Sequence, residues 1–204
     1  GASVALVERG RLGGTCTNDG CVPTRVLAKA ARLARDAEQF ATYGLIAEAP
    51  RVDFETLIKR TQQVVYSIQE KKQLIHHLKT SGVEVITGQG SARFLDPRTL
   101  AVGEALQMQA NNFLIAAGGR PRKLSFPGAE LTLTHSDVWS MTRLPESVAI
   151  VGAAATGCQL ASIFSAFCTQ VTILEVGPRL LGSEDEAVAQ AVQQAFEERT
   201  IQVI

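Results

Sequence analysis

A chain of 204 residues is long enough for one large domain or parts of two, and 46% hydrophobic residues with 20% charged residues are typical of a globular protein. Its 20 basic and 20 acidic residues cancel, so no global charge favours nucleic acid or an anionic membrane as a partner. Four cysteines are too few for a small secreted disulfide scaffold, and no apolar run is long enough to cross a bilayer, so we expect a cytoplasmic protein.

The first half of the sequence predicts a strand, two helices and a group of short strands. The strand covers residues 3–8, and a glycine-bearing loop with two cysteines separates it from an alanine-rich helix over residues 23–41. A second, amphipathic helix is expected over residues 54–78. Gly, Asn and Asp-Pro turns separate four further strand candidates, at residues 83–86, 92–94, 99–102 and 112–116.

The second half predicts a different architecture. Residues 118–147 are rich in Gly and Pro and are expected to connect two domains. From residue 148 the pattern alternates strand, helix, strand, helix and strand, which predicts a parallel, right-handed βαβ sheet. Ser183 and Glu186 have the spacing of a capping box for the last helix. Strand patterns close to both ends lead us to expect that the sequence is part of a longer protein.

Cys16 and Cys21 are the first candidates for chemistry. Four residues separate them, and Gly20 eases the tight turn that two sulfurs need in order to meet. Pro23 places the pair at or just before the start of a helix, where the partial positive charge stabilises a thiolate and lowers the thiol pKa. The residue types favour a redox-active dithiol and leave open a buried or metal-binding pair.

A second motif lies where the strand that begins at residue 148 meets the following helix. Gly152 permits a tight turn, and Gly157 permits close packing of the helix on the strand. These are two features of a dinucleotide-binding turn, and they occur in the strand–turn–helix context that such a turn requires. Ala154 stands where the middle glycine would be and crowds the pyrophosphate slightly.

Acidic residues end two of the predicted strands. Glu175 follows the glycine turn at the spacing of an acid that binds a ribose 2′-hydroxyl, which favours NAD over NADP. Arg179, close behind it, leaves NADP possible. Glu8 ends the first strand in the same way, and it is either a second ribose-binding residue or a surface glutamate.

The remaining histidines and cysteines belong to no motif. We expect His76 and His77 to be solvated helix residues, and His135 lies in the predicted linker. Cys158 and Cys168 are expected to be small core residues, so no metal site is predicted.

The segment Gly-Gly-Thr-Cys-Thr-Asn-Asp-Gly-Cys-Val-Pro-Thr, residues 13–24, resembles the signature of the class I pyridine nucleotide–disulfide oxidoreductases. That family includes dihydrolipoyl dehydrogenase, glutathione reductase and mercuric reductase. Residues 116–121 are similar to the family's second FAD-contact segment, and residues 148–175 to its NAD(P)-binding unit. The resemblance implies an α/β fold of two Rossmann-like domains. An FAD-binding domain with a β-meander, truncated at its N-terminus, would cover residues 1–145, and an NAD(P)-binding domain, truncated at its C-terminus, would cover residues 146–204.

The resemblance also implies a reaction. A nicotinamide would reduce FAD, and FAD would pass two electrons to a Cys16–Cys21 disulfide, with Cys21 facing the flavin and Cys16 attacking the substrate. Glu8 would bind the FAD ribose. The residues expected to line FAD are Gly14, Thr15, Gly90, Ala117 and Gly118.

The implied substrate is a small disulfide or dithiol, or Hg(II). The complete protein would be a homodimer whose partner subunit supplies a His–Glu acid/base pair from outside this sequence, so this segment alone would be inactive. No nucleic acid or membrane partner is expected.

Three positions depart from the family pattern. Arg25 and Gln159 stand where relatives have a lysine and a glutamate that pair near the flavin, so an ion pair becomes a charged–neutral contact. We expect an altered flavin potential or slower hydride transfer. Ala155 stands where some relatives place an aromatic residue, which predicts a more open nicotinamide pocket.

Two other classes of function remain open. An NAD(P)H:quinone-type flavin reductase would not require the cysteines. A non-enzymatic redox sensor would use the dithiol to report the NADH/NAD balance to a partner.

Overall fold

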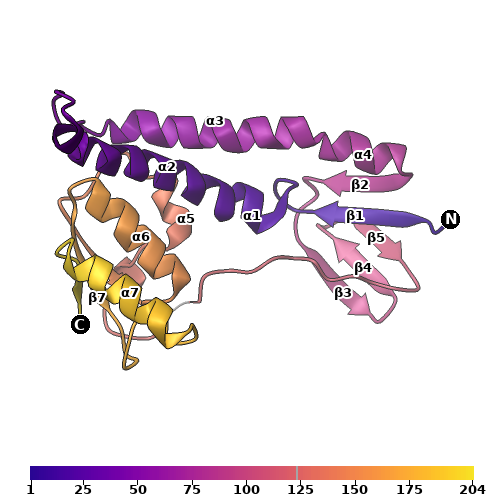
Figure 1. Ribbon diagram of the computed structural model, residues 1–204. Helices are drawn as coiled ribbons and strands as arrows, with labels where there is room; N and C mark the ends of the chain where they lie inside the picture. The colour runs from indigo at the N-terminus through magenta and orange to yellow at the C-terminus, as the bar shows by residue number, and fades with distance from the viewer. Residues whose placement is uncertain (123) are drawn as a thin grey trace. The chain divides into compact units, whose positions relative to one another are not determined.

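A computed structural model describes residues 1–122 and 124–204 of the chain (Figure 1), and the packing of its backbone divides it into two compact units. Unit 1 comprises Gly1–Val22 and Gln63–Thr132, and unit 2 comprises Pro23–Gln62 and Leu133–Ile204. The units reflect chain packing, and the boundary between two cofactor-binding domains near residue 145 remains a prediction.

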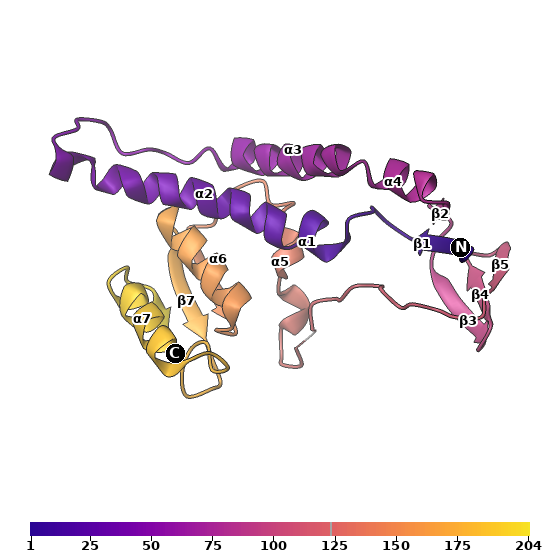
Figure 2. The same cartoon turned by 45° about the vertical axis from the view of Figure 1, so that its right-hand side comes forward.

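Unit 1 contains two small sheets. The first is a parallel pair, which needs a long crossover, and the helical segments between residues 14 and 80 supply it. The second is an antiparallel meander of three strands joined by short turns (Figure 2). The parallel pair is β1 (Val4–Glu8) with β2 (Val83–Thr87), and the meander is β3 (Ala92–Asp96), β4 (Thr99–Val102) and β5 (Leu106–Gln109).

The strand expected at residues 112–116 is not formed, and β5 is the third strand of the meander instead. Within the described part of the chain, this apolar run pairs with no strand, and Leu114 is 99% exposed. Strand propensity measures how well a residue fits a pleated, half-buried surface. The described residues provide no such surface here, so the propensity alone was misleading.

The helix expected over residues 54–78 is two helices, α3 (Phe54–Lys72) and α4 (Leu74–Thr80). Gln73 separates them in a left-handed conformation with φ of 42°, which interrupts a right-handed helix. The apolar periodicity continues across this break, which explains why the pattern suggested one helix.

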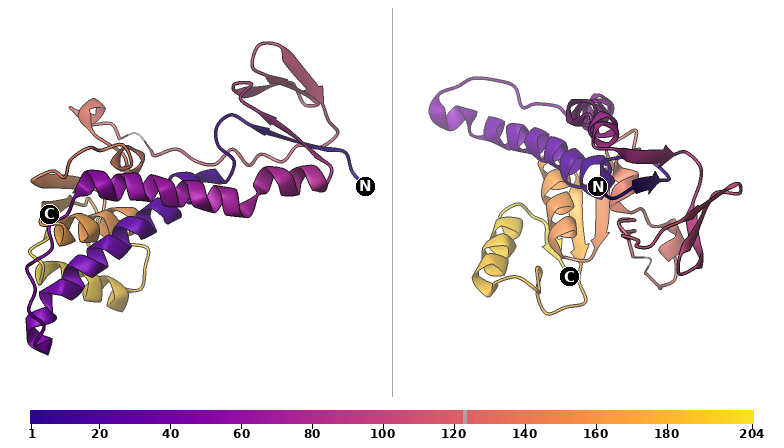
Figure 3. Two further views of the ribbon diagram at one scale, coloured as in Figure 1. Left: turned by 90° about the horizontal axis from the view of Figure 1, so that it is seen from above. Right: turned by 90° about the vertical axis from the view of Figure 1, so that its right-hand side faces the viewer.

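Unit 2 contains the alternating strands and helices that the sequence predicts. Three parallel strands lie in the order β6 (Ser147–Val151), β7 (Gln170–Leu174) and β8 (Gln202–Val203). The helices α6 (Ala155–Ala166) and α7 (Glu186–Glu197) connect them. Right-handed connections in a sheet that grows in one direction place successive helices on one face. Figure 3 shows α6 and α7 on the same side of these strands.

The hydrophobic core of unit 2 forms where α2 (Cys21–Glu38) and α3 pack with α6 and the sheet. Leu27 on α2 and Ile173 on β7 have no exposed surface. Burial of each such side chain contributes about 2 kcal/mol to stability. The other fully packed members include Ala31, Phe54, Ile58, Ala161 and Phe164.

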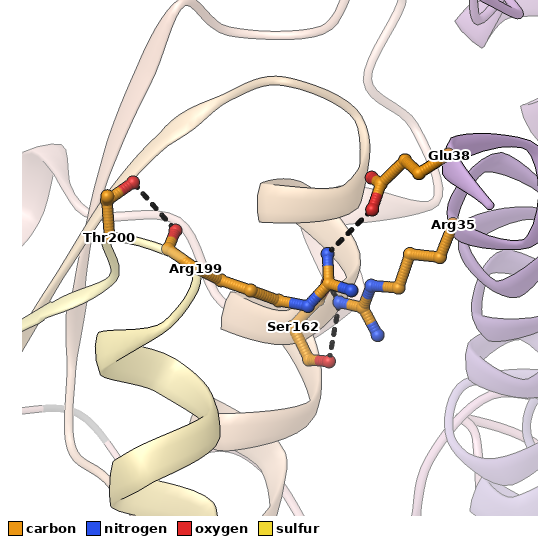
Figure 4. A network of polar contacts seen from close by, with 5 residues as sticks. All are labelled: Arg35, Glu38, Ser162, Arg199 and Thr200. Atoms are coloured by element: carbon orange, nitrogen blue, oxygen red, sulfur yellow. Dashed lines mark hydrogen bonds and ion pairs between the residues drawn. The ribbon is translucent and has the colours of Figure 1, made fainter. Parts of the chain in front are cut away.

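Polar side chains also join α2 to the rest of unit 2 (Figure 4). The Arg35 guanidinium donates to the hydroxyl of Ser162 on α6 at 2.9 Å and also to its carbonyl oxygen. Arg199, just beyond α7, forms an ion pair with Glu38 at 3.5 Å. Burial, and then the charge of Arg199, lowers the pKa of Arg35. Arg35 is therefore a partly buried cation, and its loss is expected to lower the stability of the fold.

The caps of the helices differ in part from those expected. α7 is capped by Asp185, whose carboxylate accepts from the backbone N–H of Ala187 at 2.9 Å, so the predicted capping box at Ser183 is wrong. A capping box occurs instead at the short helix α5 (His135–Val138), between Thr134 and Asp137. The remaining short helices are α1 (Gly14–Asn18), η1 (Phe40–Tyr43) and η2 (Ala129–Leu131).

Candidate active site

The two cysteines of the signature lie close together in unit 1. Cys16 is in α1, and Cys21 is the first residue of α2. Both are free thiols with exposed side chains, and they lie close enough for Cys21 to shift the pKa of Cys16. The expected loop is thus a short helix followed at once by another, and this turn brings the two sulfurs together as their spacing predicts.

Contact with Cys21 raises the pKa of Cys16 above the usual value for a thiol. The largest cause is the hydrogen bond from one thiol to the other, followed by desolvation and by repulsion from a Cys21 thiolate. The positive charge of Lys72 and the backbone N–H of Cys21 lower the pKa of Cys16, but by less. The expectation that the helix terminus lowers this pKa is therefore wrong for Cys16, because the neighbouring thiol outweighs the helix.

Polar side chains near the C-terminal end of α3 hold α1 in place. The Gln69 amide donates to the Asn18 side-chain oxygen, and Lys72 Nζ donates to Thr17 Oγ1 at 3.3 Å. Asn18 in turn donates to the carbonyl oxygen of Arg11 at 3.0 Å. Sequence reasoning missed Gln69 and Lys72, because no local pattern links them to a helix about fifty residues earlier in the chain.

Two segments predicted to contact FAD meet in unit 1. Gly118 has φ of 74°, and a Cβ placed there would lie 3.2 Å from Thr15 Oγ1. The backbone of residues 117–118 therefore lies against the Thr15 hydroxyl, and a larger residue at 118 would displace it. Gly14, directly before Thr15, also has a positive φ, of 67°. Thr15 and Gly118, from the two segments predicted to contact FAD, thus lie side by side.

Glu8 and Gly90 belong to the same unit. Glu8 ends β1, and its carboxylate accepts from the backbone N–H of Gly10 at 2.6 Å. Gly90 has φ of 96°, and a Cβ there would lie 3.3 Å from Gly103 Cα. The close approach of the turns at Gly90 and Gly103 therefore explains the glycine at position 90 without a role in cofactor binding.

The glycine turn of unit 2 has the geometry that its sequence predicts. Gly152 follows β6 with φ of 101°, and Ala154 is the N-cap of α6. A Cβ at Gly157 would lie 2.0 Å from the carbonyl oxygen of Gly152, so α6 approaches this turn too closely for any other residue. The backbone N–H groups that begin α6 therefore lie directly after the turn, and their binding of a pyrophosphate stays a prediction.

Glu175 is held against this turn. Its carboxylate accepts from the backbone N–H of Ala153 at 2.6 Å and of Gly177 at 2.8 Å. These two bonds, that from Ala153 first, lower the pKa of Glu175, so the side chain is ionised at neutral pH. A cavity of about 620 Å³ borders Glu175, and its other walls are Gly177–Leu180, the polar face of α7 and the end of β8.

Arg179 forms hydrogen bonds within its own loop. Its guanidinium donates to the carbonyl oxygens of Leu181 at 3.0 Å and Glu184 at 2.8 Å. It also lines the cavity beside Glu175. Its hydrogen bonds hold the loop after β7 in shape, which is a structural role that the sequence did not suggest.

The positions that depart from the family pattern are at the surface. Arg25 on α2 and Gln159 on α6 are both exposed, and no hydrogen bond joins them among the residues that the structure describes. Ala155, the first residue of α6, is exposed as well. The predicted contact between Arg25 and Gln159 stays a prediction.

One of the predictions for the other histidines and cysteines is wrong. Cys158 is buried, as expected, whereas Cys168 is exposed with φ of 65°, because α6 ends at Ala166 and the chain turns there. His76 and His77 are exposed on α4.

Across residues 1–122 and 124–204, no group of three or more His, Cys, Asp or Glu residues could hold a metal ion. In the same residues, no helix has the length and apolar character needed to span a membrane.

Comparison with known proteins places this arrangement in a family. The family model described as pyridine nucleotide-disulphide oxidoreductase matches residues 1–204, and the chain belongs to this family. The chain is 35% identical over 211 residues to a dihydrolipoyl dehydrogenase of Bacillus subtilis, covering all of this chain and 45% of the relative. It is 29% identical over 205 residues to a mercuric reductase of Bacillus cereus, covering all of this chain and 32% of the relative.

A solved structure shows the same fold. The Cu(II) complex of the HOCl-induced flavoprotein disulfide reductase RclA from Escherichia coli superposes with a TM-score of 0.80 at 27% identity, over 98% of this chain and 43% of that one. The chain thus spans less than half the length of each of these relatives. Members of the family are enzymes that use FAD and NAD(P)H. The resemblance that the cysteine signature suggests, and the mixed α/β fold, are confirmed.

Proposed function

We propose that this chain carries the dithiol and the nucleotide-binding segments of an FAD-dependent NAD(P)H disulfide oxidoreductase. The observation that carries the proposal is the contact between the Cys16 and Cys21 thiols at the junction of α1 and α2. Two exposed thiols in contact can exchange with an external disulfide and close on each other. Residues 1–145 would belong to the FAD-binding domain and residues 146–204 to the NAD(P)-binding domain.

The reaction of the dithiol conserves atoms and electrons. The Cys16 thiolate attacks one sulfur of the substrate disulfide, whose S–S bond breaks, and the departing thiolate takes a proton from solvent. The Cys21 thiolate then attacks the Cys16 sulfur, releases the second substrate thiol and leaves a Cys16–Cys21 disulfide. Two electrons pass to the substrate in this cycle. The outer role of Cys16 and the inner role of Cys21 follow the family resemblance.

FAD, when bound, supplies the two-electron chemistry that joins NAD(P)H to the disulfide. The described residues fit such a group, because the Thr15 hydroxyl and the Gly118 backbone form one wall and Glu8 ends a neighbouring strand in the same unit. We assign Glu8 to the FAD ribose. The residues assigned to the cofactor wall are Gly14, Thr15, Gly90, Ala117 and Gly118.

The turn of unit 2 fits a dinucleotide. Gly152, Ala154 and Gly157 would place the pyrophosphate at the start of α6, and the Glu175 carboxylate would accept from the ribose 2′-hydroxyl. Glu175 keeps unused lone pairs beyond its two backbone bonds, so it can accept a further hydrogen bond. Its negative charge disfavours a 2′-phosphate, which supports NAD over NADP.

The substrate is proposed to be a small disulfide or dithiol, with Hg(II) as the alternative, since dihydrolipoyl dehydrogenase and mercuric reductase are both among the relatives. The complete protein is proposed to act as a homodimer. Arg25 and Gln159 are proposed to adjust the flavin site next to the dithiol.

Turnover of the complete, FAD-loaded protein tests the proposal. NADH oxidation would be followed with lipoamide, glutathione disulfide or Hg(II), and with a quinone as an acceptor that bypasses the dithiol. Cys16→Ser and Cys21→Ser should each reduce disulfide turnover about 100-fold or more and leave quinone reduction intact. Cys168→Ser, a change at an exposed cysteine outside the pair, serves as the matched control.

Disulfide turnover that survives both Cys16→Ser and Cys21→Ser would contradict the proposal. Quinone reduction as the sole activity of the parent protein would point to a quinone-type reductase. Reduction of the dithiol by NADH without turnover of any acceptor would point to a redox sensor.

A further inference from the structure

One side chain holds the loop that follows β7. The guanidinium of Arg179 donates to three backbone carbonyl oxygens, those of Leu181 at 3.0 Å, Gly182 at 3.2 Å and Glu184 at 2.8 Å. The planar fork of an arginine can serve several acceptors at once, whereas a lysine carries its charge on a single ammonium group. Three of the N–H donors of Arg179 are therefore occupied within its own loop.

The same loop is attached to the glycine turn through Leu181. The backbone N–H of Leu181 donates to the carbonyl oxygen of Ala153 at 2.8 Å. Leu181 has a φ of 48°, in the left-handed region that leucine rarely adopts, and only 9% of its surface is exposed. A residue stays in such a conformation only where its surroundings fix it. Here the bond from Arg179 fixes the Leu181 carbonyl, and the bond to Ala153 fixes its N–H.

Ala153 connects this loop to Glu175. The Ala153 N–H donates to the Glu175 carboxylate at 2.6 Å, and the preceding N–H, of Gly152, donates to the carbonyl oxygen of Leu174 at 2.8 Å. Besides the loop N–H, the Ala153 carbonyl accepts from the Cys158 thiol at 3.2 Å, which is a weak donor. The N–H that faces Glu175 thus lies between two fixed backbone groups, one held by β7 and the other by the loop.

Two roles are open to Arg179, because it lines the cavity that also borders Glu175. As a free cation it would attract the 2′-phosphate of NADP. Its donors are instead used by carbonyl oxygens of the loop. The Glu175 carboxylate beside it is ionised, since the bond from Ala153, first among the causes, lowers its pKa. Both observations favour a role in holding the loop over a role in binding a phosphate.

We propose that Arg179 is a positioning residue of the nucleotide site. It fixes the loop after β7 and, through the bond between Leu181 and Ala153, keeps the Ala153 N–H directed at Glu175. The inference rests on the proposed function, because it takes Glu175 as the acceptor for a ribose 2′-hydroxyl. Arg179 would then support the binding of NAD by acting through Glu175, in contrast to an arginine that selects NADP by binding its phosphate.

Binding of three nucleotide fragments to the complete, FAD-loaded protein, measured by titration calorimetry, tests this role. ADP-ribose carries the 2′-hydroxyl of the adenosine ribose, its 2′-deoxy form lacks that group, and its 2′-phospho form carries the phosphate of NADP. The parent protein should bind ADP-ribose about tenfold more tightly than the 2′-deoxy form, because a hydrogen bond to a charged group is lost with the hydroxyl. Arg179→Met should bind ADP-ribose about fivefold more weakly than the parent and the 2′-deoxy form equally well.

A conservative variant separates the two roles. Arg179→Lys keeps the positive charge but cannot hold three carbonyls, so it should lose ADP-ribose affinity nearly as Arg179→Met does. A phosphate-binding arginine predicts the opposite, namely that Arg179→Met loses affinity for the 2′-phospho form alone and that Arg179→Lys retains it. Arg60→Met, at an exposed arginine of unit 2, is the matched control and should bind all three compounds as the parent does.

A double variant shows whether Arg179 acts through Glu175. If it does, the losses are not additive, so Arg179→Met should weaken ADP-ribose binding much less in a Glu175→Gln background than in the parent. The 2′-deoxy form is an internal reference in every protein. A loss of folding would weaken its binding too, whereas a misdirected carboxylate would not.

Three results would overturn the inference and leave the proposed function standing. These are equal ADP-ribose affinities of the parent and Arg179→Met, a loss in Arg179→Met confined to the 2′-phospho form, and losses that add in full with Glu175→Gln. A parent protein that binds ADP-ribose and its 2′-deoxy form equally would overturn the role of Glu175 together with this inference. The disulfide turnover of the cysteine variants is a separate measurement, so the dithiol chemistry stands or falls independently.

Discussion

The guanidinium of Arg35 donates to both the carbonyl oxygen and the hydroxyl of Ser162, so a side chain of α2 is fastened to α6 by two bonds from one group. α2 is also the helix that begins at Cys21. The far end of the dithiol helix is thus secured by polar contacts in unit 2, beside the Leu27 and Ala31 packing.

Replacing Arg35 should destabilise the protein. Arg35→Met removes the donor to Ser162 and keeps most of the buried stem, and we expect a loss of about 1–2 kcal/mol in the free energy of unfolding. Denaturant unfolding measures this change. Arg32→Met is the matched control, because Arg32 is exposed and its contact with Asp36 is a surface pair at 3.9 Å. Equal midpoints for the two variants would refute a stabilising role for the Arg35 contact.

Gly157 should tolerate no side chain. In Gly157→Ala the added Cβ would overlap the carbonyl oxygen of Gly152, so α6 or the turn must shift. We expect a loss of about 2–3 kcal/mol in stability and weaker NADH binding, measured by unfolding and by titration. Gly119→Ala is the control, since a Cβ there meets no atom within 4 Å. A Gly157→Ala protein with parental stability would show that the close approach of α6 is not required.

Glu175 should contribute stability at neutral pH that is lost in acid. Backbone hydrogen bonds, chiefly from Ala153, lower its pKa below the usual 4.5. A depressed carboxyl pKa stabilises the folded state above the pKa of the unfolded chain, and this contribution falls as pH drops through the lower folded value. The stability advantage of the parent over Glu175→Gln should therefore be present at neutral pH and vanish in acid.

Stability curves of the two proteins against pH test this expectation, with Glu48→Gln as an exposed control. An advantage of the same size across the whole acid range would mean that the ionised carboxylate is not what stabilises the turn. Glu175→Gln should also narrow the preference for NADH over NADPH, as measured by kcat/KM for the two nucleotides.

The pair Arg25 and Gln159 should influence the flavin if they lie near it as the family resemblance implies. Arg25→Lys combined with Gln159→Glu restores the residue types of relatives, with an ion pair in place of a charged–neutral contact. We expect a shifted flavin potential and faster reduction by NADH, measured by spectroelectrochemistry and stopped flow. Each single replacement serves as a control. An unchanged potential and rate in the double variant would reject the role.

The features that the sequence predicted well are those fixed by neighbours in the chain. Gly152 and Gly157 are five residues apart, and their geometry follows from one strand, one turn and one helix. The meeting of Cys16 and Cys21 is likewise a property of one short turn. Local spacing was therefore enough to predict the shape of the glycine turn, the proximity of the two cysteines and the alternation of strands and helices in unit 2, while the chemical roles of these residues stay predictions.

The features that the sequence could not predict depend on distant partners. The run at residues 112–116 has strand propensity but pairs with no strand in the described residues. Gln73 breaks a helix without any change in the apolar pattern. The raised pKa of Cys16 and the contact of Lys72 with Thr17 come from side chains of other helices. A prediction based only on the start of one helix does not include them.

Glu8, the last residue of β1, and Glu175, directly after β7, make the same local hydrogen bond. Each accepts the backbone N–H of the residue two positions ahead, Glu8 from Gly10 and Glu175 from Gly177. The hydrogen bond fixes the rotamer of the glutamate side chain before any ligand binds. Ordering a free side chain on binding costs about 0.5–1.5 kcal/mol, and a pre-oriented carboxylate avoids this cost. In the nucleotide sites proposed for Glu8 and Glu175, the turn itself would hold the carboxylate, so we expect that lengthening the turn after either glutamate weakens nucleotide binding even with the glutamate retained.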